Sequence, residues 1–157
     1  MDIKAFKMDG LGNDFVIIDR REEDVSLSKE QIIKIGDRNN VGFDQIIFIE
    51  KKIDDVFPIK IFNPDGIEVG ACGNGSRCIA YLILKENNQR FIKLKAEKKI
   101  LEAEILSEKN VKINMGFPKF NEWYDIPLEN EKLNPKMLEL DVLKKEFGKG
   151  FCVNVGN

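Results

Sequence analysis

Histidine is absent from the 157 residues of this chain. The missing imidazole excludes Ser-His and Cys-His nucleophile pairs and removes the commonest metal ligand in proteins. Cysteine is scarce as well: the thiols Cys72, Cys78 and Cys152 are odd in number and include no closely spaced pair of the zinc-ligand type. They argue against a disulfide scaffold and a structural metal site, so we expect any cysteine chemistry to be thiol chemistry.

Long apolar runs are also missing. No stretch approaches the ~18–20 residues of a membrane span, and the segment 1–4 does not open a signal peptide. The 25 lysines and arginines nearly balance the 27 aspartates and glutamates, so no polybasic patch indicates a nucleic-acid or membrane partner. With 43% apolar and 33% charged residues, we expect a soluble, cytoplasmic globular protein of one or two domains.

Strand-forming residues dominate the rest of the pattern. Strands over 3–7 and 15–19 are predicted on either side of the glycine turn at Gly10 and Gly12. A capping-box spacing at Ser28 predicts a short helix that ends near Asp37. The other predicted elements are strands over 45–50, 58–63, 91–96, 100–106 and 111–115, and a central helix from about Asn74 to Asn87–Asn88. Two helices without βαβ alternation predict an α+β fold.

The segment 72–78, Cys-Gly-Asn-Gly-Ser-Arg-Cys, places a thiol directly before the turn that opens the central helix. Backbone N–H groups in a first helical turn lack partners and carry the positive end of the helix dipole. There a cysteine's pKa can fall from about 8.5 to roughly 3.5–7.5, which makes the thiolate available as a base. The same donors can hold a carboxylate. Cys72 is the candidate base, and Cys78 and Cys152 are expected in the core.

Three more blocks precede this turn: Gly-Leu-Gly-Asn-Asp-Phe at 10–15, Gly-Phe-Asp-Gln at 42–45 and Ile-Phe-Asn-Pro-Asp-Gly at 61–66. In this order and at these spacings, the four blocks resemble the diaminopimelate epimerase family, from about Lys4 to Asn157. The resemblance implies an isomerase that interconverts LL- and meso-2,6-diaminopimelate in lysine and peptidoglycan precursor biosynthesis. It also implies catalysis without pyridoxal phosphate or any other cofactor, and without a metal.

The resemblance implies a two-lobed fold, in which each lobe is a curved, mainly antiparallel, barrel-like sheet wrapped around a central helix. Residues 1–116 match the first lobe, and 117–157 match a linker and the opening strands of the second. The family's second cysteine and its final strand, which returns to the first lobe, have no counterpart in the 157 residues. We therefore expect this chain alone to be inactive, and to self-associate or dock with a separately supplied second lobe.

In the family, two thiols face opposite sides of the substrate's α-carbon; one removes the proton and the other returns one. Cys72 matches the first of these thiols. The resemblance assigns the backbone amides of Gly73 and Asn74 to the substrate's α-carboxylate. It assigns further substrate contacts to Asn13, Gln45, Asn63 and Asn157, and amide side chains suit this role because they both donate and accept hydrogen bonds.

Several of these residues also have an ordinary structural interpretation. Asn13 suits a turn, Gln45 the start of a strand and Asn63 the end of one. Two neighbouring carboxylates in the same blocks, Asp14 and Asp44, have the character of structural loop anchors rather than catalytic acids.

Arg77 is interpreted as a charge on the helix surface or a member of an internal ion pair.

Two other functions of the chain stay open. One is another racemase or isomerase of the same superfamily, such as a proline racemase-like enzyme. The other is a non-catalytic remnant that only binds a ligand or a partner chain.

Overall fold

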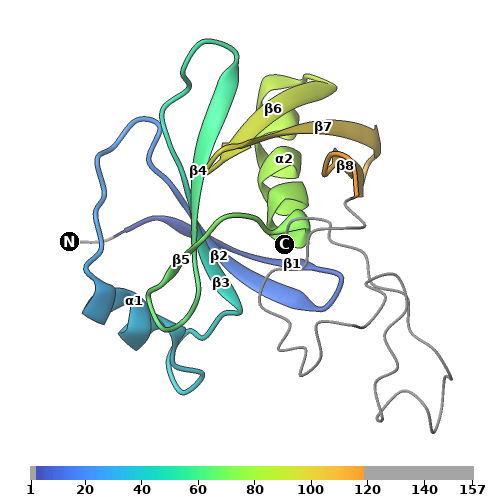
Figure 1. Ribbon diagram of the computed structural model, residues 1–157. Coiled ribbons are helices and arrows are strands. Elements are labelled where there is room, and N and C mark those ends of the chain that lie inside the picture. The colour runs from blue at the N-terminus through green and yellow to red at the C-terminus, as the bar shows by residue number, and fades with distance from the viewer. Residues whose placement is uncertain (1–2, 119–157) are drawn as a thin grey trace, which may run out of the picture. The chain divides into compact units, whose positions relative to one another are not determined.

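The computed structural model describes residues 3–118, in which one curled sheet wraps around a helix (Figure 1). The described elements, in chain order, are β1 (Ala5–Gly10), β2 (Asn13–Asp19), α1 (Lys29–Gly36), β3 (Gln45–Ile49), β4 (Val56–Phe62), β5 (Glu68–Val69), α2 (Gly73–Asn87), β6 (Phe91–Ala96), β7 (Lys99–Ser107) and β8 (Asn110–Asn114). Over this range, no helix combines the length and the apolar character needed to cross a membrane.

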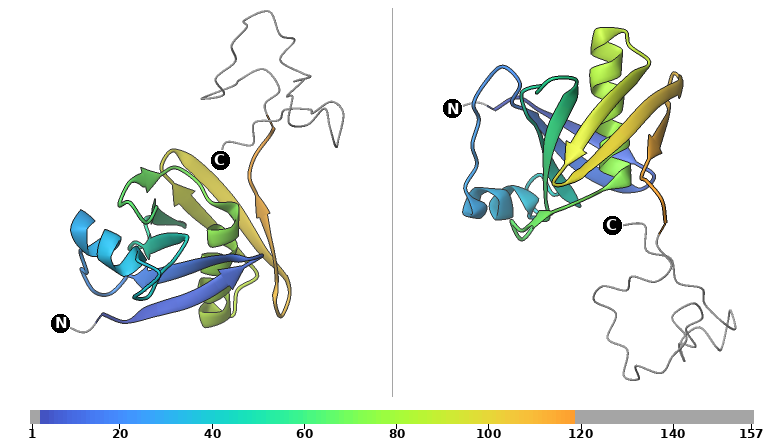
Figure 2. Two further views of the ribbon diagram at one scale, coloured as in Figure 1. Left: turned by 90° about the horizontal axis from the view of Figure 1, so that it is seen from below. Right: turned by 45° about the horizontal axis from the view of Figure 1, so that its top comes forward.

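The strands pair in the order β1-β2-β3-β4-β6-β7-β8, with the short β5 alongside β4. Five of the pairings are antiparallel, while β2–β3 and β4–β6 are parallel. The sheet curls so that its concave face surrounds α2 (Figure 2). The expected α+β architecture, a curved and mainly antiparallel sheet around a central helix, is confirmed.

The expectation of no βαβ alternation is wrong. The helix α1 lies in the connection between the parallel strands β2 and β3, and α2 lies in the connection between the parallel strands β4 and β6. Parallel neighbours require such crossovers. Consistent with these crossovers, β2 and β3 carry continuous buried apolar runs, which are typical of strands covered on both faces.

Two apolar cores explain those continuous runs. On the concave side, Phe15, Ile17, Ile47 and Ile49 pack in the large core with α2. On the other side, the residues that alternate with them join a smaller core that includes Ile32 of α1; they are Val16, Ile18, Ile46 and Phe48. Successive side chains of a strand point to opposite faces, so each helix receives one set.

The local signals at the first turn and the first helix are confirmed. Between β1 and β2, Leu11 and Gly12 both have positive φ (56° and 87°), which is the geometry of a two-residue hairpin turn. At α1, Ser28 Oγ accepts from Gln31 N (3.3 Å) and Gln31 Oε1 accepts from Ser28 N (2.8 Å). This is the predicted capping box.

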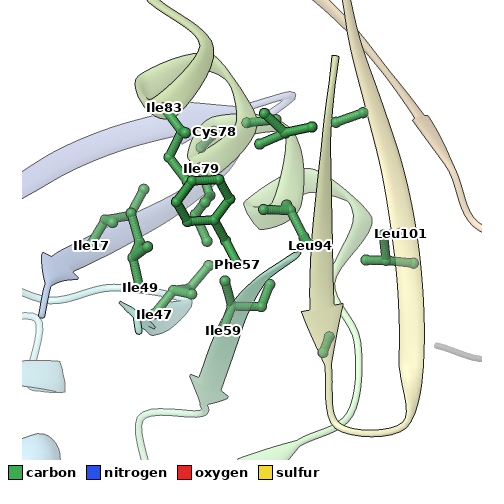
Figure 3. Packing of buried hydrophobic residues seen from close by; sticks show 14 of the residues in the cluster. Ile17, Ile47, Ile49, Phe57, Ile59, Cys78, Ile79, Ile83, Leu94 and Leu101 are labelled. Carbon is green, nitrogen blue, oxygen red and sulfur yellow. The ribbon is translucent and has the colours of Figure 1, made fainter. Parts of the chain in front are cut away.

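The central helix α2 contributes several residues to the larger core, where the strands of the sheet pack against it (Figure 3). Ile79 and Ile83 on it are fully buried among strand residues. The helix ends where Asn88 adopts a left-handed conformation (φ 50°), as the sequence predicts. At its other end, a Cβ on Gly75 would lie 2.4 Å from Ile47 Cδ1 and 3.3 Å from Phe15 Cε1. Glycine therefore lets the first turn approach the sheet closely.

We predict that Gly75→Ala lowers the free energy of unfolding, while Gly73→Ala leaves it nearly unchanged. Overpacking against Ile47 costs about 1–3 kcal/mol, against a gain of up to about 1 kcal/mol in helix propensity. At Gly73, an added Cβ would meet only Met115, at 3.4 Å, which is ordinary van der Waals contact. Urea unfolding of both variants checks this, and equal stability of the two would show that the close approach is unimportant.

Candidate functional site

Cys72 is the N-cap residue of α2. Its backbone is extended (φ −153°, ψ 105°), and its Sγ accepts a hydrogen bond from Gly75 N at 3.3 Å. The thiol is half-buried. The sulfur thus lies directly over the first helical turn, in the place that the sequence predicts, where the helix dipole favours a negative charge.

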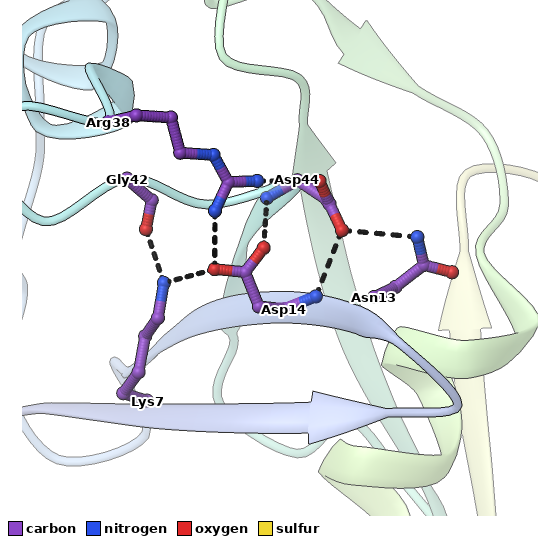
Figure 4. Close-up of polar contacts among 6 residues, drawn as sticks. All are labelled: Lys7, Asn13, Asp14, Arg38, Gly42 and Asp44. Carbon is purple, nitrogen blue, oxygen red and sulfur yellow. Dashed lines mark hydrogen bonds and ion pairs between the residues drawn. The ribbon is translucent and has the colours of Figure 1, made fainter.

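Two of the predicted amide residues, Asn13 and Asn74, are hydrogen-bonded to each other. Asn74 Nδ2 donates to Asn13 Oδ1 at 2.6 Å, and this contact joins the start of β2 to the first turn of α2. Asn13 Nδ2 in turn donates to Asp44 Oδ2 at 3.1 Å (Figure 4). Asn13 directly follows the hairpin turn and is also hydrogen-bonded to Asn74 and Asp44, so its structural and functional interpretations are compatible.

The other two amides form a second pair. Gln45 opens β3, Asn63 directly follows β4, and Gln45 Nε2 donates to Asn63 Oδ1 at 3.1 Å. Gln45 Oε1 is buried, and no group of the described residues donates to it. Because β2 and β3 are parallel and β4 is antiparallel to β3, the ends that carry Asn13, Gln45 and Asn63 lie at one edge of the sheet. Asn157 lies outside the described residues.

Asp14 and Asp44 are structural anchors, as the sequence indicates. Asp14 accepts from Lys7 Nζ (2.6 Å) and Arg38 Nη1 (2.7 Å), and Asp44 accepts from Arg38 Nη2 (2.7 Å) and Asp14 N (3.0 Å) (Figure 4). The Arg38 guanidinium, with the ammonium of Lys7, holds the pKa of the Asp14 carboxyl well below its usual range. This network fixes the loop before β3 against the start of β2.

Arg77 has a contact that the sequence interpretation missed. Its Nη2 donates to the side-chain carbonyl of Asn74, so its partner is a neutral amide rather than the carboxylate of an ion pair. The two residues are three positions apart on α2, which places them on the same face of the helix. That spacing was the available signal.

Cys78 lies in the core, as expected. Its side chain is 5% exposed, its Sγ lies 3.7 Å from the Asp9 carbonyl, to which it donates, and burial raises the pKa of the thiol to about 11. Cys152 lies outside the described residues. Among residues 3–118, no group of three or more cysteine, aspartate or glutamate side chains is placed to hold a metal ion.

The sequence model of the family described as Diaminopimelate epimerase matches residues 5–121. The chain belongs to the diaminopimelate epimerase family. It is 46% identical over 160 residues to the diaminopimelate epimerase of Pelagibacter ubique, covering 100% of this chain and 58% of that protein. It is 38% identical over 162 residues to the enzyme of Nitrosospira multiformis, covering 100% of this chain and 57% of that protein. The chain thus spans less than two thirds of the length of these relatives.

Solved structures show the same fold as this diaminopimelate epimerase family member. A predicted epimerase from Pseudomonas aeruginosa superposes with a TM-score of 0.59 and 16% identity, covering 79% of this chain and 46% of that one. A phenazine biosynthesis protein of the PhzF family from Bacillus anthracis gives a TM-score of 0.51 at 21% identity, covering 74% of this chain and 40% of that one.

Alkylation should distinguish the two described thiols of this family member. We predict that iodoacetamide labels Cys72 before Cys78 between about pH 7 and pH 9, because Cys78 is buried and titrates near 11. Mass mapping of partially labelled protein measures the order. Labelling of Cys78 first, in protein that remains folded, would contradict the placement of both thiols.

Asp14 should make the free energy of unfolding depend on pH in the acid range. Its folded-state pKa lies below the ordinary 3.8, so its stabilisation is present above about pH 4 and is lost as the pH falls further. We predict that Asp14→Ala lowers the free energy of unfolding at neutral pH by about 1 kcal/mol, because its partners Lys7 and Arg38 are partly exposed to solvent, and makes that free energy less dependent on pH below about pH 4. The control is Asp55→Ala, whose side chain is 95% exposed. Equal acid sensitivity of both variants in urea unfolding would disprove the assignment.

Proposed function

We propose that residues 1–116 form the first lobe of an enzyme that interconverts LL- and meso-diaminopimelate, and that 117–157 are a linker and the opening strands of its second lobe. The observation that carries the proposal is the position of Cys72, whose thiol caps a buried helix beside the gathered amides of Asn13 and Asn74. Family membership supports the reaction. On this proposal the protein acts in the cytoplasm on a small-molecule substrate.

The first turn of α2 supplies the carboxylate site in this proposal. The first N–H groups of a helix have no intrahelical acceptor, and Gly75 N–H is already occupied by the Cys72 sulfur. Gly73 and Asn74 hold the two preceding helical positions, so their N–H groups bind the substrate's α-carboxylate. Binding there brings the α-carbon to the Cys72 thiolate.

The thiolate then removes the α-proton and becomes a thiol. The electron pair left on the α-carbon is delocalised toward the carboxylate, which the same N–H donors stabilise without pyridoxal phosphate. A second thiol, on the opposite face, returns a proton and completes the inversion. Cys78 cannot take that role because it is buried in the helix body.

The pair Gln45 and Asn63 supports recognition of an amino group. Asn63 Oδ1 holds Gln45 Nε2, and this bond fixes the amide so that Oε1 is the end left to accept. A buried acceptor without a donor is unfavourable, and on this proposal the end of the strands rearranges on binding so that an ammonium group of the substrate reaches and satisfies Gln45 Oε1. A set of amides suits a substrate with an amino-acid group at each end better than proline, which is the substrate of the alternative racemase.

The test joins residues 1–157 to the portion of the Pelagibacter ubique relative beyond the matched region. We predict that this chimera converts LL- to meso-diaminopimelate and does not racemise proline. Cys72→Ala should lower kcat by about 10²–10⁴-fold, the usual contribution of a general base. Cys78→Ala is the matched thiol control and should stay active.

The 157-residue polypeptide by itself should give no measurable epimerisation, because one thiol exchanges the proton of one face and cannot deliver to the other. An active Cys72→Ala chimera would contradict the role of Cys72. Conversion by the 157-residue polypeptide at the rate of the relative would contradict the two-lobe requirement.

A further inference from the structure

Two charged residues stand at opposite ends of a hydrogen-bonded chain that contains both site asparagines. Asp44 Oδ2 accepts from Asn13 Nδ2, Asn13 Oδ1 accepts from Asn74 Nδ2, and Asn74 Oδ1 accepts from Arg77. Every bond in this chain, which we term the amide relay, runs in the same direction. Bonds aligned in this way polarise and strengthen one another.

The charged ends determine which way the amides face. A primary amide can turn over and exchange its donor and acceptor ends, but a carboxylate only accepts and a guanidinium only donates. If Asn13 and Asn74 turned over, an amide oxygen would face the Asp44 carboxylate and an amide N–H would face Arg77. Both contacts would be repulsive, so one orientation of the relay is selected.

The two ends of the relay lie on different elements of the fold. Asp44 is fixed by Arg38 Nη2 at 2.7 Å and by Asp14 N at 3.0 Å. Arg77 lies on α2, three residues after Asn74. The relay therefore connects the loop before β3, the start of β2 and the first turn of α2.

We propose that Asp44 and Arg77 are positioning residues, which orient the Asn13 and Asn74 amides beside Cys72 through this relay. The proposal deepens the proposed function and rests on it for the identity of the ligand. Each amide uses one N–H and one lone pair of its oxygen within the relay. In Asn13, one N–H and one lone pair therefore remain for the substrate and point in a fixed direction. Asn74 is held beside Cys72, with its backbone N–H toward the α-carboxylate of the substrate.

The relay can be measured without a ligand. In the isotope-labelled 157-residue chain, NMR should detect scalar coupling across the hydrogen bond from Asn74 Nδ2 to Asn13 Cγ. We expect Arg77→Met to abolish this coupling, and Asp44→Asn, whose neutral amide can present either its oxygen or its N–H to Asn13, to reduce it, while the backbone amide spectrum stays folded. Arg77→Lys, which keeps a donor, should retain part of it. The matched controls Arg90→Met and Asp55→Asn change an arginine and an aspartate that form ion pairs outside the relay, and they should leave the coupling intact.

Titration of the chimera with meso-diaminopimelate, with each substitution placed in its first 157 residues, then tests the consequence for binding. We expect Arg77→Met and Asp44→Asn to weaken binding by on the order of tenfold, as for loss of one oriented hydrogen bond. Arg77→Lys should recover part of the affinity, and both controls should bind as the original chain does.

Coupling that is absent from the original chain, or that is unchanged in both Arg77→Met and Asp44→Asn, would overturn the proposal. If Arg77→Met fails to fold, Arg77→Lys and Asp44→Asn decide it in the same way. Lost coupling with unchanged affinity would overturn the positioning role. Intact coupling together with a chimera that does not respond to diaminopimelate would instead contradict the proposed function, while the orienting of the amides would stand.

Discussion

The rest of the structure depends on the close approach between the first turn of α2 and the concave face of the sheet. A glycine at position 75 allows it, since any side chain would occupy the space of the Ile47 methyl group. The contact brings the positive end of a buried helix to the edge where β2 and β3 begin. Cys72, as the cap of that helix, is held there by the same packing that forms the core, so its position follows from the fold rather than from a loop.

The polar side of the site depends on charges that do not act in the chemistry. A network of ion pairs and hydrogen bonds connects the loop before β3 to the start of β2; its members are Lys7, Arg38, Asp14 and Asp44. Asn13 is hydrogen-bonded to Asp44 of this network and, on its other side, to Asn74 of α2. Without such charged partners, the neutral amide side chains could turn over and exchange their donor and acceptor ends. In this lobe, buried apolar packing thus places the thiol, and a charged network at the surface orients the amides.

Much of this could be predicted from the sequence because it is local. The cap at Cys72, the end of α2 near Asn88 and the capping box at Ser28 each depend on a few adjacent residues. The parallel pairings were missed because they depend on which strands become neighbours. The amide relay was missed because two of its three bonds join residues 31 and 61 positions apart, so that strand register must be known before these contacts can be seen.

We propose that the thiol of Cys72 and the first turn of α2 together form one half of an amino-acid site. A crystal structure of the protein with bound meso-diaminopimelate tests this directly. We expect one carboxylate on the N–H groups of Gly73 and Asn74, with the adjacent α-carbon within about 3.5 Å of Cys72 Sγ. A ligand bound away from that turn, for example in the cleft of about 540 Å³ beside Tyr81 and Lys109, would contradict it.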